Sequence, residues 1–349
     1  MTSTTTIMQT TGTREILFRE AINECLRQEM ELDENVIIIG EEIAGGAGRQ
    51  DQGVEDAWGG PFRTTVGLIQ QFGKERVLDA PLSEAAFIGT AIGAASTGRR
   101  PVAELMFIDF IGVCMDQLVN NAAKMRYMFG GQVKVPFTMM TRIGAGFGAA
   151  AQHSESYYSI FSHIPGLKGV VPSDAYTAKG LLAAAIRDDD PVVYFEHKGL
   201  YGIAGPVPEE PYVLPLGKAR TVREGTDITL VGISKMTWIC TAAAEELAKE
   251  GISCEVIDLL SVSPIDYDHV NESVQKTHRL VVVDEDTPVC SLASEICARV
   301  AEEVFDYLDA PPSRVTAPHT PVPYSRSMEN EYMPNESRVI TTVKNLMNR

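Results

Sequence analysis

The chain has 349 residues, of which 47 are acidic and 30 are basic, so its formal net charge is −17. This length is enough for two domains that each bury a core of their own. Hydrophobic residues make up 44% of the chain and charged residues 22%, which excludes a globally disordered protein. The acidic excess disfavours nucleic acid and anionic membranes as partners, because both attract basic surfaces.

The six cysteines are scattered and form no Cys-x-x-Cys pair, so the sequence gives no support to a disulfide framework or a zinc site. No apolar run approaches the roughly 20 residues that cross a membrane. Residues 1–13 are rich in threonine and lack a hydrophobic signal core, which indicates a flexible tail. The expected location of the protein is the cytoplasm.

Hydrophobic patterning predicts alternating helices and strands from residue 14 onward. A helical face begins there, and a β-branched run at 36–39 is typical of a strand buried on both sides. The glycine-rich segment 45–67 indicates a long functional loop. The next predicted strands are 76–79, 101–107, 135–141, 169–171 and 192–196, and the predicted helices are 84–97, 113–128 and 176–187.

A proline cluster at 206–217 indicates a linker between two domains, 14–205 and 218–349. The second domain repeats the alternation of strands and helices. Its predicted strands are 227–233, 254–259 and 280–284, and its predicted helices are 237–250, 291–306 and 337–347. Strands that alternate with helices favour parallel sheets covered on both faces. The expected fold is therefore α/β, with two doubly wound domains.

Three polar segments follow predicted strands of the first domain, where ligands of parallel sheets bind. Glu41 follows the first strand, Glu84 follows the second, and His153 lies among small residues after the strand at 135–141. Apolar neighbours at 85–88 leave Glu84 little water. Carboxylates and an imidazole at one sheet edge predict acid–base chemistry. Each residue also has a structural interpretation: a solvated loop acid, a helix-start carboxylate, or a structural histidine.

Two other functions are alternatives. Gly144-x-Gly146-x-x-Ala149 matches the dinucleotide fingerprint of an NAD-dependent dehydrogenase, but the segment follows a later strand and opens no apolar helix. A non-catalytic scaffold would instead use an acidic segment, 284–286, to dock a basic partner.

Several ordered motifs resemble the β subunit of the thiamine diphosphate-dependent E1 component of 2-oxo acid dehydrogenase-type complexes. The matching segments are 36–42, 81–84, 100–104, 116–124, 150–154, 165–168, 178–181 and 185–188. Segments 44–49 and 56–60 are most similar to the acetoin dehydrogenase branch, with pyruvate and branched-chain 2-oxo acid enzymes as alternatives. The resemblance implies a pyrimidine-binding transketolase-like domain followed by a C-terminal transketolase-like domain.

The resemblance also implies a cofactor, thiamine diphosphate, that is shared with an α subunit in an α2β2 heterotetramer. The α subunit would hold Mg²⁺ and the diphosphate through a Gly-Asp-Gly motif, which this sequence lacks. Glu84 would hydrogen-bond the aminopyrimidine ring nitrogen, and Phe110 would pack on that ring. Glu41 and His153 would face the substrate and the lipoyl group. Acetoin would be cleaved to acetaldehyde, leaving a hydroxyethyl group on the cofactor, and acetyl would pass to lipoamide.

Two further binding sites are implied by the same resemblance. A monovalent cation, K⁺, would lie beneath the active site at Phe137, Ala185, Asp188 and Asp190. Residues 188–190 are equally explained as a solvated turn before a proline. The C-terminal domain would dock the E2 lipoyl acyltransferase.

Overall fold

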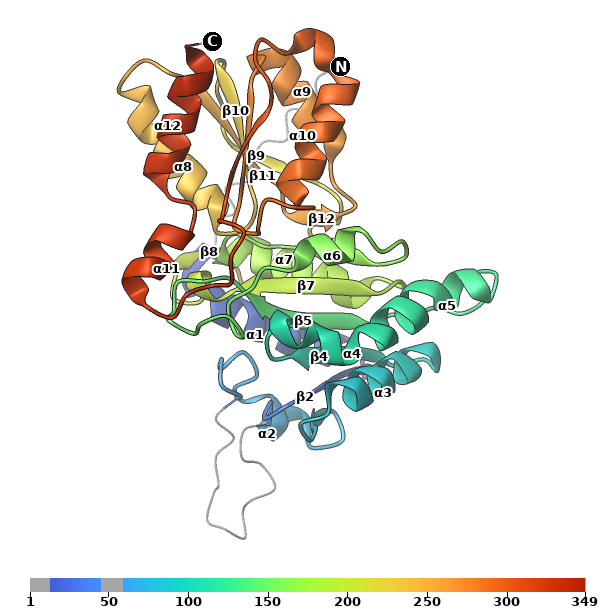
Figure 1. Ribbon diagram of the computed structural model, residues 1–349. Coiled ribbons are helices and arrows are strands. Elements are labelled where there is room, and N and C mark those ends of the chain that lie inside the picture. Colours follow the sequence, from blue (N-terminus) through green and yellow to red (C-terminus); the bar gives the residue numbers. More distant parts are fainter. Residues whose placement is uncertain (1–12, 45–58, 349) are drawn as a thin grey trace.

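Figure 1 shows the computed structural model, which describes residues 13–44 and 59–348. The predicted tail, apart from Thr13, lies outside these ranges, as do most of the segments 44–49 and 56–60. All six cysteines lie within the described ranges and are unpaired, and four of them are buried.

The first domain is built on a seven-stranded sheet with the order β12-β6-β7-β5-β4-β2-β3. Six of these strands are parallel, as expected for a doubly wound fold. They are β2 (Val36–Gly40), β3 (Val77–Asp79), β4 (Arg100–Leu105), β5 (Thr138–Ile143), β6 (Lys168–Val170) and β7 (Val192–His197). The seventh, β12 (Ser261–Ser263), comes from the second half of the chain and pairs antiparallel with β6.

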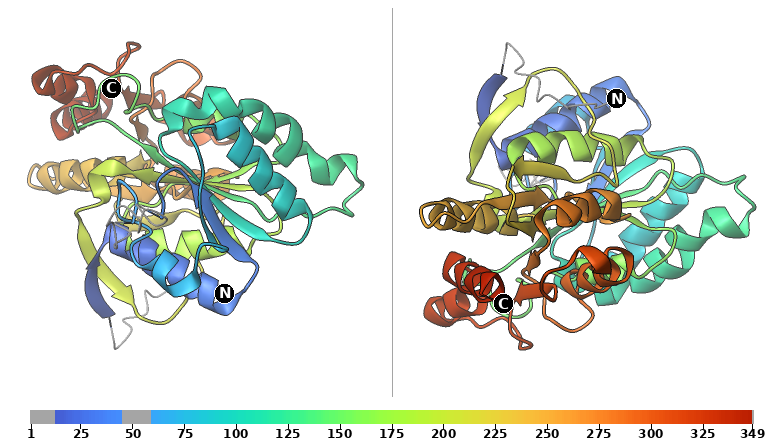
Figure 2. Two further views of the ribbon diagram at one scale, coloured as in Figure 1. Left: turned by 90° about the horizontal axis from the view of Figure 1, so that it is seen from below. Right: turned by 90° about the horizontal axis from the view of Figure 1, so that it is seen from above.

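Helices cover both faces of this sheet, which the view from below in Figure 2 shows clearly. One face carries α1 (Phe18–Leu32), α2 (Leu68–Phe72) and α7 (Ala175–Arg187). The other carries α3 (Glu84–Ser96), α4 (Ile111–Asp116), α5 (Ala123–Met128) and α6 (Tyr158–Ser162), with a π-helical turn, Gln117–Ala122, joining α4 to α5. Successive strand residues enter opposite cores: Val102 packs toward α1 and α7, and Ala103 toward α3.

The second domain repeats this architecture on a five-stranded sheet with the order β14-β13-β10-β11-β9. The strands are β9 (Arg220–Arg223), β10 (Ile228–Gly232), β11 (Cys254–Asp258), β13 (Leu280–Asp284) and β14 (Ser313–Thr316). Helices α8 (Met236–Ala248) and α12 (Glu336–Met347) cover one face, and α9 (Tyr267–Thr277) and α10 (Leu292–Glu303) cover the other. A short helix, α11 (Arg326–Tyr332), lies near the first domain (Figure 1). The predicted doubly wound α/β class is confirmed for both domains.

Local differences from the sequence prediction have tertiary causes. The first helix begins at Phe18 rather than at residue 14, because β1 (Thr13–Leu17) pairs antiparallel with β8 (Ala204–Pro208). That pairing also places the first prolines of the predicted linker in a strand. Neither β12 nor α9 was predicted from the pattern. Single 3₁₀ turns occur at Ile108–Phe110, Lys198–Leu200 and Phe305–Tyr307.

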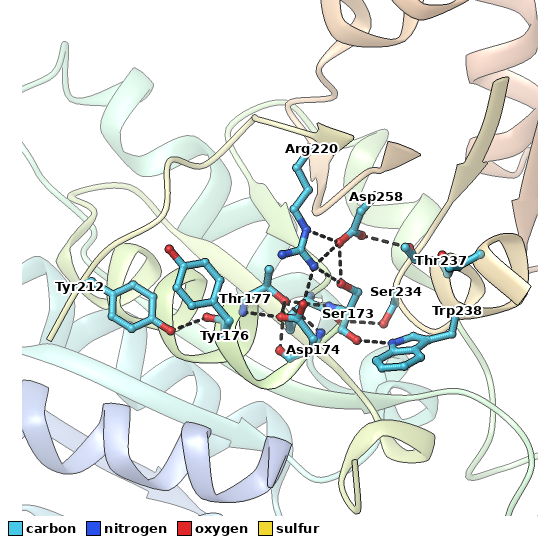
Figure 3. Close-up of polar contacts among 12 residues, drawn as sticks. Ser173, Asp174, Tyr176, Thr177, Tyr212, Arg220, Ser234, Thr237, Trp238 and Asp258 are labelled. Carbon is cyan, nitrogen blue, oxygen red and sulfur yellow. Dashed lines mark hydrogen bonds and ion pairs between the residues drawn. The ribbon is translucent and has the colours of Figure 1, made fainter. Parts of the chain in front are cut away.

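The two domains share buried contacts. One apolar core includes Phe195 of the first sheet together with Ile257 and Val262 of the second half of the chain. Figure 3 shows a polar cluster at the same junction, centred on Arg220. Its guanidinium donates to Asp258 at 2.9 Å and to Asp174, at the start of α7, at 2.6 Å. These contacts fix the C-terminal domain against the edge of the first sheet.

Candidate active site

The strands of the first sheet place the predicted polar residues at one edge. Glu41 directly follows β2, Glu84 opens α3 just after β3, and His153 lies between β5 and α6. Because β2, β3 and β5 run parallel, all three segments leave the sheet at its carboxyl edge. The topology therefore places Glu41, Glu84 and His153 at the same edge of the sheet.

Glu41 is a buried carboxylate with an unused acceptor. Its side chain is 4% exposed, and Oε1 has no hydrogen-bond partner among the described residues. Burial, the neighbouring carboxylate of Glu84 and that of Glu104 together raise the pKa of Glu41 to about 7. Close to neutrality this group can therefore hold or release a proton.

The ionisation of Glu41 predicts a pH-dependent gain in stability when it is replaced. Since its pKa is above the ordinary 4.5, the folded protein binds this proton more tightly than the unfolded chain, and that stabilisation is lost as pH rises toward 7. Glu41→Gln is therefore expected to raise the melting temperature at pH 8 but not at pH 4.5. Thermal unfolding checks this. Glu34→Gln, an exposed control before the same strand, should change neither value.

Glu84 is the first residue of α3 and is half-buried in this chain. It lies close enough to Glu41 for the two charges to interact. The apolar neighbours Phe87 and Ile88 point into the core, whereas Ala86 is exposed, so Glu84 keeps contact with solvent on one side. An open side next to a carboxylate leaves room for a ligand or a partner subunit.

His153 lies in an aromatic corner beside Phe107 and Phe110. Its ring meets that of Phe107 edge-on at 4.7 Å between centroids and that of Phe110 at 5.5 Å. The two phenylalanine rings are 5.8 Å apart. The structure thus brings Phe110 and His153 together, as it does Glu41 and Glu84.

Two side chains that the sequence prediction missed hold the segment around His153. Lys198 donates from Nζ to the carbonyl of His153, and Asp109 accepts from the backbone N–H of Ser154 at 3.2 Å and of Glu155 at 3.3 Å. Burial lowers the pKa of Lys198 to about 8, although the nearby charge of Asp109 acts to raise it. Only the position of Lys198 directly after a buried strand could have signalled this role.

A buried ion-pair cluster surrounds Arg142, on β5. Arg142 is fully buried and contacts Glu104 at 2.6 Å, Glu196 at 3.7 Å and the Tyr201 hydroxyl at 2.9 Å. Burial raises the pKa of Glu196 to about 7. The guanidinium also stacks over the Phe62 ring at 4.4 Å, and Phe62 in turn contacts Phe107. Charged residues inside apolar strands were the sequence signal for this cluster.

The carboxylates predicted to bind a monovalent cation contact basic side chains. Asp188 accepts from Lys168 Nζ at 2.8 Å, and Asp190 accepts from both Lys168 and Arg126. The Phe137 carbonyl accepts from the Val192 N–H at 2.9 Å, and the Ala185 carbonyl from the Asp188 N–H at 3.3 Å. Across residues 13–44 and 59–348, no three His, Cys, Asp or Glu side chains are grouped to hold a metal ion.

The structure argues against both alternative functions, the NAD-dependent dehydrogenase and the non-catalytic scaffold. In the loop that carries the glycine fingerprint, the backbone N–H groups of Ala145, Gly146 and Gly148 donate to carboxylates. They are therefore not free to cradle a dinucleotide phosphate. Residues 284–286, the docking segment of the scaffold alternative, are buried and form no exposed acidic surface. Their side chains face the first domain, because β13 ends at the domain junction.

The fold defines a two-domain α/β protein that carries two glutamates and a histidine at the carboxyl edge of its first sheet. Residues 14–203 match the pyrimidine-binding domain of transketolase, and residues 217–339 match the transketolase C-terminal domain. The chain belongs to the transketolase-like family of E1 β subunits, as its relatives show. Thiamine diphosphate-dependent chemistry is the chemistry that this family implies.

Relatives match over nearly the whole chain. This chain is 52% identical to the acetoin:2,6-dichlorophenolindophenol oxidoreductase subunit beta of Bacillus subtilis (strain 168), over 96% of this chain and 98% of the relative. The protein of the same name from Cupriavidus necator is 51% identical over the same shares. The mitochondrial pyruvate dehydrogenase E1 component subunit beta-2 of Oryza sativa subsp. japonica is 42% identical, over 95% of the chain and 86% of the relative.

Solved structures share the fold at lower identity. A chain described as a split gene transketolase, inactive beta4 tetramer, superposes with a TM-score of 0.74 at 20% identity, covering 95% of this chain and 98% of that one. Transketolase from Campylobacter jejuni gives a TM-score of 0.65 at 14% identity, covering 96% of this chain and 47% of the other. Within residues 13–44 and 59–348, no helix is long and apolar enough to cross a membrane.

Proposed function

We propose that this chain is the β subunit of a thiamine diphosphate-dependent acetoin dehydrogenase E1, active with an α subunit in an α2β2 heterotetramer. The observation that carries the proposal is the near-full-length identity, above 50%, to two acetoin oxidoreductase β subunits, against 42% to a pyruvate dehydrogenase β subunit. Pyruvate or a branched-chain 2-oxo acid is the second candidate substrate, because the same cofactor chemistry serves all three.

The residues at the sheet edge fit the cofactor. Glu84 has an open side, and Glu41 has a buried oxygen without a partner among the described residues. The half-buried ring of Phe110, which contacts His153, offers an apolar surface after β4. In this proposal Glu84 hydrogen-bonds the aminopyrimidine ring nitrogen, Phe110 packs on the pyrimidine ring, and Glu41 borders the substrate. Mg²⁺ and the diphosphate are held by the α subunit.

The side chains of this chain position groups and move protons. When bound, thiamine diphosphate would supply a nucleophile for the substrate carbonyl and an electron sink for cleavage of the C–C bond. Glu84 holds a proton at the aminopyrimidine ring nitrogen and thereby sets the cofactor's protonation state. Glu41, with its pKa near 7, exchanges a proton with the substrate oxygen. His153 serves acetyl transfer to the lipoyl group of an E2 acyltransferase.

The proposal includes three finer assignments. E2 docks on the C-terminal domain, and the complex is cytoplasmic. K⁺ binding at Phe137, Ala185, Asp188 and Asp190 stays a prediction. In this structure Lys168 contacts the carboxylates of both Asp188 and Asp190. Equilibrium dialysis with Rb⁺ can test the cation.

A substrate screen of the reconstituted complex tests the main proposal. The β chain and its α partner, with thiamine diphosphate and Mg²⁺, are assayed for reduction of 2,6-dichlorophenolindophenol with acetoin, pyruvate and branched 2-oxo acids. Acetoin is expected to give the highest kcat/KM. A higher value for pyruvate would move the chain to the second candidate substrate.

Replacing His153 by alanine is expected to separate the two half-reactions. Acetylation of lipoamide should fall by about 10²-fold, the lower range for a lost proton-transfer group, while dye reduction falls much less. Parallel assays of the two acceptors measure this. His163→Ala, an exposed histidine at the end of α6, is the matched control. Unchanged lipoamide acetylation in the His153 variant would remove this residue from the mechanism.

A further inference from the structure

We propose that Glu285 and Glu329, both in the C-terminal domain, are positioning residues of the active site: together they hold the glycine loop 144–148 so that His153 lies beside Phe107 and Phe110. The inference rests on the role of His153 in the proposed function and assigns the C-terminal domain a part in catalysis beyond docking.

Glu329, on helix α11, binds the loop with both carboxylate oxygens. It is 1% exposed, Oε1 accepts from the Gly146 N–H at 2.7 Å, and Oε2 accepts from the Gly148 N–H at 2.8 Å. Hydrogen bonds to an ionised acceptor are about twice as strong as neutral ones. The carboxylate therefore fixes two backbone groups of a loop that has almost no side chains of its own.

Glu285, directly after β13, binds the preceding residue and a histidine. Oε1 accepts from the Ala145 N–H at 2.6 Å, and Oε2 lies 2.7 Å from Nε2 of His197. Since Nδ1 of His197 accepts from the Gly199 N–H at 3.0 Å, the ring proton is on Nε2 and is donated to Glu285. Burial lowers the pKa of His197, so the ring is neutral near pH 7.

Gly144 allows the loop to approach this histidine. Its φ is +94°, and a Cβ there would lie 2.3 Å from His197 Nε2. The far end of the His153 segment is attached to the same domain, because Tyr158 donates to Asp284 and Ser159 donates to Asp286 at 2.7 Å. The C-terminal domain thus binds the segment before and after His153, while Lys198 and Asp109 hold its centre from the first domain.

The composition of the segment explains why such anchors are needed. Between Gly144 and Ala151 every residue except Phe147 is glycine or alanine. A chain of small residues loses much conformational entropy on ordering and offers few side-chain contacts to offset it. Backbone hydrogen bonds to buried carboxylates supply the missing constraint, and a displacement of about 1 Å near the chemistry can cost on the order of 10²-fold in rate.

The test compares Glu329→Gln with Glu331→Gln, an exposed residue on the same helix, in the α/β complex. A glutamine offers one acceptor oxygen, and its NH₂ faces the second backbone N–H. Lipoamide acetylation by the Glu329 variant is expected to fall about 10- to 100-fold in kcat with little change in KM. Glu285→Gln should behave alike. Wild-type acetylation in both variants, or an equal loss in the Glu331 control, would overturn the inference.

Two further measurements separate positioning from general destabilisation. In a His153→Ala background, Glu329→Gln should cost almost nothing more, whereas independent structural damage would be additive. Hydrogen exchange of the β chain should show faster exchange at the 145–151 amides in the Glu329 and Glu285 variants, and unchanged exchange in the Glu331 control. Exchange unchanged from wild type, or additive losses, would overturn the inference. Failure of the proposed function would appear differently, as absent acetoin turnover in the unmodified complex with the exchange result intact.

Discussion

Glu84→Gln is expected to lower kcat of the reconstituted α/β complex by about 10²–10⁴-fold, the range for loss of a general acid–base group. Glutamine has the size of glutamate and can hydrogen-bond at the same position, but it cannot exchange a proton. Because Glu84 is half-buried at the first turn of α3, its replacement leaves the core residues Phe87 and Ile88 in place. The variant should therefore fold and assemble.

Dye reduction with acetoin measures the loss of kcat. Sedimentation of the complex measures whether the variant still assembles. Glu75→Gln removes the same charge from an exposed position in the same domain and serves as the control. Activity within a few-fold of wild type in the Glu84 variant would contradict its assignment to the cofactor. Loss of the tetramer would instead show that Glu84 acts in assembly.

Arg142→Met is expected to lower the free energy of unfolding by about 3–5 kcal/mol, which is the usual cost of breaking a buried ion pair. The variant would leave Glu104 and Glu196, both buried on strands of the first sheet, without their cation. It also removes the stacking on Phe62. For a domain of this size the melting temperature should fall by roughly 6–20 °C, which calorimetry can measure.

The same substitution should show a defined pH dependence. Glu196 already has a pKa near 7, above its ordinary 4.5, so the folded chain binds this proton more tightly than the unfolded chain. That contribution to stability is lost as pH rises through the folded pKa. Loss of Arg142 raises the pKa of Glu196 further, so the penalty should be larger at pH 8 than at pH 6. A penalty equal at both values would contradict this account.

A double variant separates the ion pair from simple packing. Arg142→Met combined with Glu104→Leu replaces both partners of the closest pair by apolar groups. Such replacements are often close to neutral. The comparison is made at pH 6, where Glu196, whose pKa is about 7, is mostly protonated and leaves little unpaired charge. The double variant should therefore recover much of the stability lost in the single one. Additive losses would show that shape, rather than charge, dominates at this position.

The secondary structure could be predicted wherever local pattern and burial agree. The run 280–284 forms β13 with the predicted bounds, and the helix at 84–97 differs from α3 by one residue. Prediction failed where a distant segment determines the conformation. Residues 14–17 form a strand through pairing with β8, and β12 exists only because Ser261–Ser263 pairs with β6. Neither pairing leaves a periodic signal in the sequence.

The positions of the candidate site residues could be predicted, but the residues that contact them could not. Glu41, Glu84 and His153 follow strands of a parallel sheet, and this order alone brings them to one edge. The groups that hold the His153 segment come from elsewhere in the chain: Lys198 binds the carbonyl of His153, and Asp109 accepts from the N–H of Ser154. A contact between residues far apart in the sequence cannot be derived from spacing.

The sequence by itself determined two α/β domains, the order of strands and polar segments, and the family, because these follow from local hydrophobic periodicity and from motifs that are contiguous in the chain. Only the tertiary structure decided where four acidic residues of the second domain, 284–286 and Glu329, lie. The scaffold alternative used residues 284–286 as a docking segment, whereas these residues and Glu329 are buried against the first domain. Burial of a carboxylate requires hydrogen-bond donors, and those donors, the amides of a glycine loop some 140 to 180 residues away, come together only in the fold.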